Sequence, residues 1–410
     1  MRLTTVLRRL LGVTETFVEN ALLRRNGTLA VEVRPSQRRS RCGECGRGAP
    51  RYDRRPVRSW QHVPWGRTPV DLLYEPWRVE CPQCGVRVEQ VPWAVTRSRF
   101  TEEFEELAAY LSQITDRTQV HRMLGIAWAT VGSIVERVVA RRLDPKRLAG
   151  LRRIGIDEFS YKKRHQYVTV VVDHDRQRVV WAGEGRSAEA LAPFFELLGC
   201  EGCRAIELVT IDLSAAYIKA VREGLPKAEI VYDRFHVQRL VTDALDEVRR
   251  SLVRELADEP EEARAVKGTR FVLLKSRKNL SRSQRRKLSE VQQSNQRLYR
   301  AYLLKETLVR ALDYRQLGRA EPALQDWLAW ASRSRLRPFV RAARTIRKHL
   351  AGILAYIRTR LSNGLVEGLN NKIRVIARRA YGFHSHEALI AMIFLNCGGI
   401  QLDPPLPTRR

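Results

Sequence analysis

The chain has 410 residues, 44% of them hydrophobic, so its size and composition exclude a disordered protein and indicate several folded domains. Lysine and arginine number 74 against 45 aspartate and glutamate residues, and the net charge of +29 favours a polyanionic partner over a merely soluble basic protein. No run of about 18 apolar residues is present, and the pair Arg8 and Arg9 interrupts any signal-like segment. We therefore expect no membrane association and a cytoplasmic, nucleoid-associated location.

Two CxxC pairs fall within residues 1–95, and four thiolates are the ligand set of a tetrahedral structural Zn²⁺ site. Alternating residues at 57–63 and 70–79 are typical of strands between the pairs. We therefore predict a zinc ribbon with one Zn²⁺, and free buried cysteines are the alternative. The predicted ligands are Cys42, Cys45, Cys81 and Cys84. The tryptophans expected to pack around them are Trp60, Trp65, Trp77 and Trp93.

A third CxxC pair, Cys200 and Cys203, has no second pair near it and is expected in a loop between a helix and a strand. We interpret its spacing as a coincidence, because a complete zinc site needs further ligands. Cys397 stands alone and is expected in the core.

Residues 96–148 carry three segments with the helical period. The first has apolar residues between 104 and 111, and Thr101 is expected to cap it. A short helix over 118–124 ends at Gly125, and a third segment has its apolar face at 131–139. This pattern is typical of a helix-turn-helix DNA-binding domain, and a helical dimerisation hairpin is the alternative. The side chains of the third helix expected to face DNA are Trp128, Thr130, Ser133 and Arg137.

Short apolar strands follow from residue 149. The first ends at Asp157, two more cover 165–172 and 178–183, a fourth ends at Asp212 after a helix over 188–198, and a fifth ends at Asp233. This order predicts a ribonuclease-H-like mixed sheet in which the first and fourth strands are neighbours. Asp157 and Asp212 would then lie side by side and repel each other unless a cation lies between them. Glu158 is expected on the opposite face of its strand.

Residues 238–350 are helical and basic, and the run 275–288 is especially rich in cations. We favour phosphate contact for this run, and a solvated helix face is the alternative. A later helix has an apolar stripe at Val366, Leu369, Ile373 and Ile376. We place its polar residues on the opposite side, namely Glu367, Asn370, Asn371, Arg374 and Arg378. By itself, Glu367 fits a surface acid.

Three motifs stand in order: GIDEFSYK, VTIDLSAAY and SNGLVEGLNNKIR, with YDRFHV before the third and RRAYGFHS after it. This set resembles the DDE transposases of bacterial insertion sequences, specifically the ISL3 family, over residues 42 to 399. The resemblance implies a ribonuclease-H-like core with a helical insertion and a catalytic trio of Asp157, Asp212 and Glu367. It also implies two bound Mg²⁺ (or Mn²⁺) ions, binding to terminal inverted repeats and target duplex DNA, and a homo-oligomer on DNA.

With that chemistry, further residues become candidates near the site. Those expected to hold DNA phosphate are Lys372, Arg374, Arg378 and Arg379. Asp233 and His236 follow the fifth strand and are expected to support the acidic site, although Asp233 also fits a helix cap or an ion-pair partner.

The expected architecture is therefore a multidomain α/β protein. Its predicted parts are N-terminal strands and zinc ribbon 1–95, helix-turn-helix 96–148, catalytic core 149–237 with 351–400, helical insertion 238–350 and tail 401–410. The leading hypothesis is a DNA transposase. The alternatives are a domesticated DNA-binding protein with a silent core, and a ribonuclease or resolvase on the same sheet.

Overall fold

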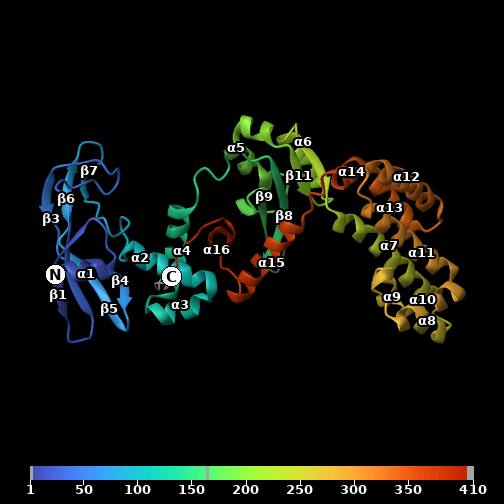
Figure 1. Cartoon of the computed structure of the whole chain (residues 1–410), viewed down its shortest axis with the longest axis horizontal. Coiled ribbons are helices and arrows are strands. Elements are labelled where there is room, and N and C mark those ends of the chain that lie inside the picture. Colours follow the sequence, from blue (N-terminus) through green and yellow to red (C-terminus); the bar gives the residue numbers. More distant parts are fainter. Residues whose placement is uncertain (1–2, 163–165, 404–410) are drawn as a thin grey trace. The chain divides into compact units, whose positions relative to one another are not determined.

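The computed structural model describes residues 3–162 and 166–403 (Figure 1). The chain forms two compact units, one made of residues 1–144, 379–381 and 387–410, the other of residues 145–378 and 382–386. The unit boundary falls between Asp144 and Pro145. Residues from Glu387 onward belong to the first unit, which differs from the expected core boundary at residue 400. Residue 165, where the second strand was expected to begin, lies outside the described residues.

The first unit contains two small sheets. One is four-stranded, in the order β1-β2-β5-β4, and its members are β1 (Thr16–Leu23), β2 (Leu29–Pro35), β5 (Thr68–Tyr74) and β4 (Arg58–Trp65), preceded by α1 (Leu3–Leu11). The other is three-stranded, in the order β3-β6-β7, and its members are β3 (Arg51–Arg54), β6 (Trp77–Cys81) and β7 (Gly85–Val88). The expected single strand over 70–79 is therefore wrong. It divides around Pro76 into strands of different sheets, because proline lacks the N–H that a ladder needs.

The tryptophans pack elsewhere than expected. Trp60 and Trp93 are buried and meet edge to face, 5.6 Å between ring centroids, in the core of the four-stranded sheet. Trp65 is 51% exposed, and only Trp77 lies on the cysteine-bearing sheet, under Arg54. The expectation that all four surround the cysteines is wrong, because aromatic area is buried in the larger core.

The helical part of the first unit follows the predicted pattern. Its members are α2 (Glu102–Ile114), α3 (Arg117–Leu124), α4 (Trp128–Arg142) and, from the end of the chain, α16 (His386–Cys397). The Thr101 hydroxyl accepts a hydrogen bond from the Phe104 N–H, and Gly125 ends α3 with φ +65°. The predicted cap and turn are thus confirmed, and α3 and α4 meet at 102°. The Gln113 side chain donates to the Leu395 carbonyl at 2.7 Å and ties α16 to α2.

Among the described helices, none is by itself long and apolar enough to cross a membrane. The bent pair α3 and α4 passes the same test by length and composition when the two are taken together.

The second unit is built on a five-stranded sheet in the order β10-β9-β8-β11-β12. Its strands are β8 (Arg153–Lys162), β9 (Gln166–Asp173), β10 (Arg178–Glu184), β11 (Leu208–Ile211) and β12 (Glu229–Tyr232). The strand β9 pairs antiparallel with both β8 and β10, and β11 runs parallel to both β8 and β12. The predicted adjacency of the first and fourth strands is confirmed. The expectation that the first strand ends at Asp157 is wrong, because β8 pairs with β9 as far as Lys162, whereas β11 ends at Ile211.

Helices complete the sheet layer. They are α5 (Ala192–Ala205), which follows a single 3-10 turn at Glu189–Leu191, and α6 (Ala215–Gly224). The helix α5 continues through Cys200 and Cys203 with a kink at Gly199, so the expectation of a loop there is wrong. Cys203 points into the main core, which supplies the apolar burial that extends the helix.

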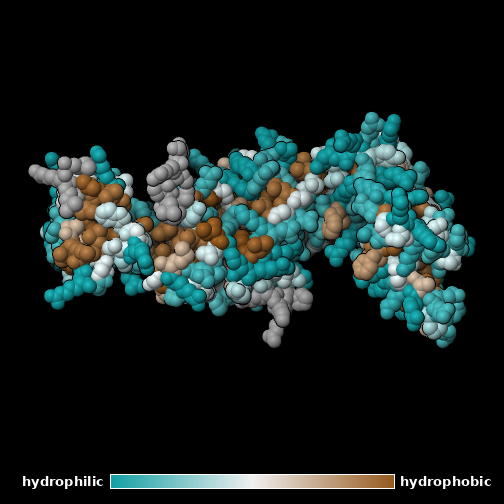
Figure 2. Space-filling model, turned by 60° about the horizontal axis from the view of Figure 1, so that its bottom comes forward, coloured by the Kyte–Doolittle hydropathy of each residue, from teal (hydrophilic) through white to brown (hydrophobic). Residues whose placement is uncertain are grey.

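The helical insertion leaves the sheet at β12 and returns through α15. Its members are α7 (Arg234–Glu255), α8 (Pro260–Lys267), α9 (Arg270–Leu274), a 3-10 turn (Arg277–Asn279), α10 (Arg282–Ser294), α11 (Gln296–Asp313), α12 (Leu317–Arg333), α13 (Arg337–Lys348) and α14 (Leu350–Thr359), followed by α15 (Gly364–Arg379). The buried residues of the insertion and those of the five-stranded sheet form one continuous hydrophobic core. The insertion surface drawn in Figure 2 is largely hydrophilic.

Candidate active site and metal centres

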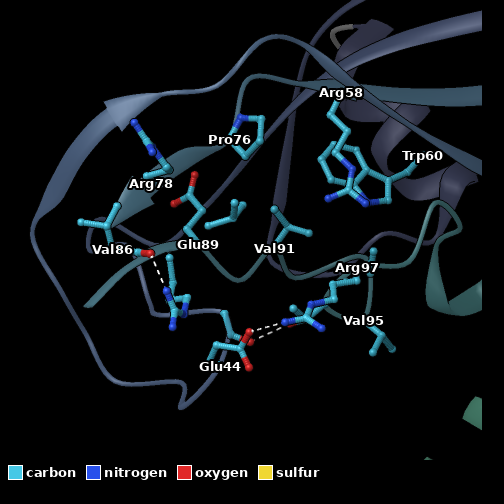
Figure 3. A pocket seen from close by; sticks show the side chains of 15 residues that line it. Glu44, Arg58, Trp60, Pro76, Arg78, Val86, Glu89, Val91, Val95 and Arg97 are labelled. Atoms are coloured by element: carbon cyan, nitrogen blue, oxygen red, sulfur yellow. Dashed lines mark hydrogen bonds and ion pairs between the residues drawn. The ribbon is translucent and has the colours of Figure 1, made fainter. Parts of the chain in front are cut away.

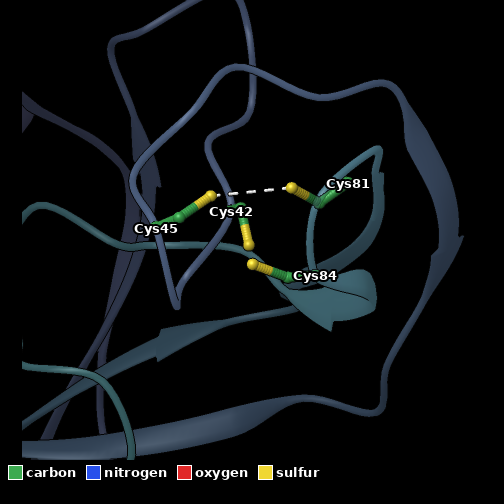
Figure 4. Close-up of side chains that lie close together, drawn as sticks. All are labelled: Cys42, Cys45, Cys81 and Cys84. Carbon is green, nitrogen blue, oxygen red and sulfur yellow. Dashed lines mark hydrogen bonds between the residues drawn. The ribbon is translucent and has the colours of Figure 1, made fainter.

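The four predicted zinc ligands come together in the first unit. The ligand atoms of Cys42, Cys45, Cys81 and Cys84 all lie within 4.8 Å of one another (Figure 4). The Sγ atoms of Cys45 and Cys81 are 3.6 Å apart, close to the separation of about 3.8 Å that tetrahedral Zn–S bonds require. The cluster therefore fits a zinc ion, and its members are not four separate buried cysteines, because Cys45 is exposed and Cys84 is half-buried.

The backbone prepares this cluster to carry charge. The N–H groups of Cys84 and Gln83 point at the Cys81 sulfur and lower the pKa of that thiol to about 7. Thiolates, rather than thiols, bind zinc. A cavity of about 260 Å³ lies nearby and is lined by residues such as Arg58, Trp60 and Glu89 (Figure 3). Its Arg97 and Glu44 side chains form a 2.9 Å ion pair, so the cavity shows no unpaired group that calls for a ligand there.

Asp157 lies in β8 on the face covered by α15. Its Oδ2 accepts a 2.7 Å hydrogen bond from the Asn370 side chain, and its Oδ1 accepts one of 2.8 Å from the Glu158 N–H. Two residues earlier, a Cβ at Gly155 would lie 2.4 Å from the Val366 Cγ2. Glycine is therefore required at that position for α15 to approach the strand closely enough to reach Asp157.

Asp212 follows β11 at the same sheet edge, and its Oδ1 accepts a 2.9 Å hydrogen bond from the Ser214 N–H. Burial raises the pKa of Asp157, and the negative charge of Asp212 adds to that rise. The structure thus brings the two predicted aspartates together. Both burial and the charge of Asp212 make the ionised form of Asp157 costly in the absence of a cation.

Glu158 contacts the other side of the sheet layer, as the alternation predicts. Its carboxylate is hydrogen-bonded to the Tyr217 hydroxyl of α6, which also lies 2.9 Å from the Thr169 Oγ1. Burial raises the pKa of Glu158 to about 7, and the charges of Asp212 and Asp157 contribute to that rise. Glu158 is therefore electrostatically part of the acidic site, although the strand directs it away from Asp157.

Glu367 lies in the first turn of α15 and is exposed. Within the described residues, no hydrogen bond or ion pair joins it to Asp157 or Asp212. Arg374, two helical turns further on, lies close enough to Asp157 for its charge to lower the pKa of that carboxyl. The helix that carries Glu367 thus reaches the aspartates, but the structure does not bring the third acid into contact with them.

Asn370 is a site residue that the sequence pattern missed. It was assigned to the polar face of its helix, yet it is 2% exposed and bonds Asp157. Its Oδ1 atom is buried and has no hydrogen-bond partner among the described residues. A polar residue within a stripe of buried residues at 366, 370, 373 and 376 is the signal that could have identified it.

Asp233 has several partners at once. It caps α7 by accepting from the Phe235 N–H at 3.1 Å, and it accepts from the Asn363 N–H at 3.2 Å. The His236 Nδ1 lies 3.6 Å from its Oδ2, an ion-pair distance. Asp233 raises the pKa of His236, and the charges of Asp212 and Asp157 raise it further. His236 therefore lies within electrostatic reach of the two aspartates.

Some of the side chains expected to contact DNA are exposed, whereas others are already bonded to residues of the same domain. Ser133 is exposed on α4, and Trp128 is 38% exposed beneath Arg117, whose guanidinium lies 4.2 Å from the ring centroid. Arg137 donates to the buried Glu105 at 2.8 and 2.6 Å. Arg137 is thus held by the domain itself, and the role of all four helix residues in DNA contact stays a prediction.

The basic residues of α15 divide in the same way. Arg379 donates to the carbonyls of Ser112 and Gln113, both at 2.9 Å, and so closes the end of α2. Arg374 donates to the Asn371 side chain at 2.8 Å and remains exposed, as does Arg378. Phosphate contact by these residues and Lys372 stays a prediction, and Arg379 already has protein partners.

Comparison with known proteins adds an independent observation. A family model described as "Transposase" matches residues 154–393, and one described as "Helix-turn-helix domain of transposase family ISL3" matches residues 89–139. The whole chain is 40% identical to "Transposase for insertion sequence element IS1557" of Mycobacterium tuberculosis, covering 98% of that protein. Over 88% of its length it is 33% identical to "Transposase for insertion sequence element IS1001" of Bordetella parapertussis, covering 89% of it.

Proposed function

Because this chain belongs to the ISL3 family of DNA transposases, we propose that Asp157, Asp212 and Glu367 form the catalytic trio that serves strand cleavage and strand transfer. The observation that carries the proposal is the pairing of β11 with the first half of β8, because Asp212 directly follows β11 and Asp157 lies in β8 just beyond the paired residues. There burial and the charge of Asp212 raise the pKa of Asp157, and α15, which carries Glu367, covers the same face.

The residues present fit divalent cations. The donors are carboxylate and amide oxygens, the ligands that Mg²⁺ prefers, and the buried Asn370 Oδ1 has no partner among the described residues. Asp157 would hold both ions of a two-metal site, Asp212 one and Glu367 the other. When bound, two Mg²⁺ (or Mn²⁺) ions supply activation of the attacking oxygen and stabilisation of the leaving oxygen at the scissile phosphate.

The chain's own side chains orient these groups. Asn370 holds one oxygen of Asp157 and so fixes the direction of the other, and the Glu158 N–H holds that second oxygen from the strand side. Asp233 and His236 support the site from the end of β12. The attacking group is water in cleavage and a DNA 3′-hydroxyl in joining, and Arg374 and Arg378 are suited to hold the phosphate.

Recognition of DNA is assigned to the first unit. In this proposal α4 reads the terminal inverted repeats through Trp128, Thr130 and Ser133, and one Zn²⁺ on the four cysteines stabilises a zinc ribbon beside it. The proposed ribonuclease-H-like core covers 149–237 and 351–378, within the second unit, and the insertion covers 238–350. A homo-oligomer on paired element ends completes the proposal.

The test is cleavage of terminal-repeat duplex with Mg²⁺ by wild type and Asp157→Ala. Asp175→Ala is the matched control, because Asp175 is an exposed acid in the turn between β9 and β10, paired with Arg153. We expect the first variant to lose at least about 1,000-fold in cleavage rate and to keep its DNA affinity. Equal cleavage by wild type and Asp157→Ala would refute the trio. Tight binding without cleavage under any divalent metal would indicate a silent DNA-binding protein.

A further inference from the structure

A lysine that the proposed chemistry does not use is buried in the helical insertion. Lys305 lies on α11 and is 2% exposed. Its ammonium donates to the carbonyls of Leu273 and Lys275, both at 2.8 Å, and lies 2.8 Å from the Glu306 Oε1. Burial lowers the pKa of Lys305, and the Glu306 carboxylate opposes that change. A buried ammonium is costly unless it is paired, so these contacts have to persist.

Glu306, the ion-pair partner of Lys305, also binds the backbone at Arg277. The second carboxylate oxygen of Glu306 accepts a 3.2 Å hydrogen bond from the Arg277 N–H. Lys305 and Glu306 together therefore fasten the chain at 273, 275 and 277, where α9 gives way to the 3-10 turn. We call this pair the clamp.

The fastened segment is the most cationic part of the insertion. From 275 to 287 it contains lysine and arginine but no aspartate or glutamate, and we call this segment the basic platform. Its cations are Lys275, Arg277, Lys278, Arg282, Arg285, Arg286 and Lys287. All except the half-buried Lys287 are exposed, whereas Leu280 points into the core and anchors the segment from below.

Little within the protein neutralises the platform. Among the described residues its one ion pair is Arg286 with Glu290, a loose contact of 3.9 Å between two exposed side chains. Lys275 donates to the Gln284 side chain at 3.3 Å, which is a neutral partner. Several of the cations also lie in the first turns of α10, near the positive end of its dipole, where cations are unfavourable without an anion.

We propose that the basic platform binds the phosphate backbone of double-stranded DNA without regard to sequence, and that the clamp holds its backbone in the binding conformation. Lysine and arginine contacts to phosphate position a duplex but carry no sequence information. Fastening the segment beforehand reduces the ordering entropy that binding would otherwise cost. The choice of DNA as the polyanion rests on the proposed function.

The first experiment measures affinity of the full chain for a random-sequence duplex by fluorescence anisotropy at several salt concentrations. The platform variant combines Arg277→Gln, Lys278→Gln and Arg282→Gln. The control combines Arg315→Gln, Arg319→Gln and Arg344→Gln, which removes equal charge from other exposed positions of the insertion. The slope of log affinity against log salt is negative, and loss of three phosphate contacts should reduce its magnitude by roughly 2.7. Equal slopes for the two variants would overturn the platform.

Cleavage of terminal-repeat DNA separates this inference from the proposed function. We expect the control variant to cleave at the wild-type rate, because its substitutions lie outside both the acidic site and the platform. If wild type itself fails to cleave, the proposed function fails, and the difference in salt slope still decides the platform.

The second experiment tests the clamp with the double variant Lys305→Met and Glu306→Gln, which leaves no unpaired buried charge. Amide hydrogen exchange at 273–279 should become faster, and affinity for the random duplex should fall. Unchanged protection of these amides would overturn the clamp. If thermal unfolding shows that the double variant does not fold, Glu306→Ala replaces it. This change removes the acceptor of the Arg277 N–H, so the Arg277 amide should lose protection while the hydrogen bonds of Lys305 to Leu273 and Lys275 remain.

Discussion

The cysteine cluster and the acidic site are both candidate metal centres, yet they are assembled in opposite ways. Each CxxC pair supplies two ligands from one tight turn, so half of the zinc site is local in the sequence. The acids come one at a time, from the middle of β8, the end of β11 and the first turn of α15. Only the sheet order and the packing of α15 on β8 bring these three segments together.

The electrostatics of the two centres also differ. Within the cysteine cluster, backbone N–H groups lower the pKa of Cys81 to about 7, whereas the Cys45 side chain and burial raise the pKa of Cys84. At the acidic site, burial and neighbouring carboxylates raise the pKa values of both Asp157 and Glu158. One thiol of the cluster is thus readily ionised, whereas the acidic site resists its own charge until cations enter.

The largest effect is expected from a substitution that removes one of the four cysteines of the cluster. Cys84→Ser should abolish tight zinc binding, reducing the metal content from about one zinc per chain to nearly none, because tetrahedral sites need all four ligands. The first unit should unfold at a lower temperature. Elemental analysis and thermal unfolding measure both effects, with the exposed Cys200→Ser as the control. Zinc retained at the wild-type level in Cys84→Ser would contradict the assignment.

A smaller effect is expected from a substitution at the acidic site that removes a hydrogen bond to Asp157. Asn370→Ala removes the hydrogen bond that orients Asp157, and loss of such a supporting contact typically costs about 10- to 100-fold in metal affinity or activity. Cleavage should fall by that factor without a change in DNA affinity. The adjacent Asn371→Ala is the matched control, because Asn371 is exposed and its side chain accepts a hydrogen bond from the Arg374 side chain, not from the acidic site. Equal loss in both variants would show that Asn370 has no special role.

The smallest effect concerns pH. The folded-state pKa of Glu158 is raised from 4.5 to about 7, so its contribution to stability is complete below pH 4.5 and is lost as pH rises through 7. In metal-free protein, Glu158→Gln should therefore flatten the fall of unfolding temperature between pH 5 and 8, by roughly 2–4 °C.

The control for this pH effect is Glu207→Gln, since Glu207 is 55% exposed and paired with Arg152 at the other end of β11. Saturating Mg²⁺ should shrink the difference between wild type and Glu158→Gln, because cations stabilise the ionised carboxylates. A pH profile of unfolding temperature that is identical in Glu158→Gln and wild type, measured without metal, would contradict the electrostatic coupling.

Local signals predicted much of the fold. Thr101 caps α2, Gly125 ends α3 in the left-handed conformation, and the β8–β11 adjacency matches the expected strand order. The errors occur where burial overrides local pattern. The stretch 70–79 divides between two sheets, and α5 runs through Cys203 because the core covers that side chain.

By itself, the sequence identified the candidate ligands: four cysteines in two turns, and two aspartates, one within and one just after strands that pair. Both follow from short-range spacing and from the small number of ways strands can be ordered. Tertiary structure alone decided that Asn370 faces Asp157, that Glu158 couples to Asp212, and that Lys305 is buried beneath the basic platform. These depend on the packing of helices from distant parts of the chain, and burial sets both the pKa values and the hydrogen-bond partners that local pattern leaves undefined.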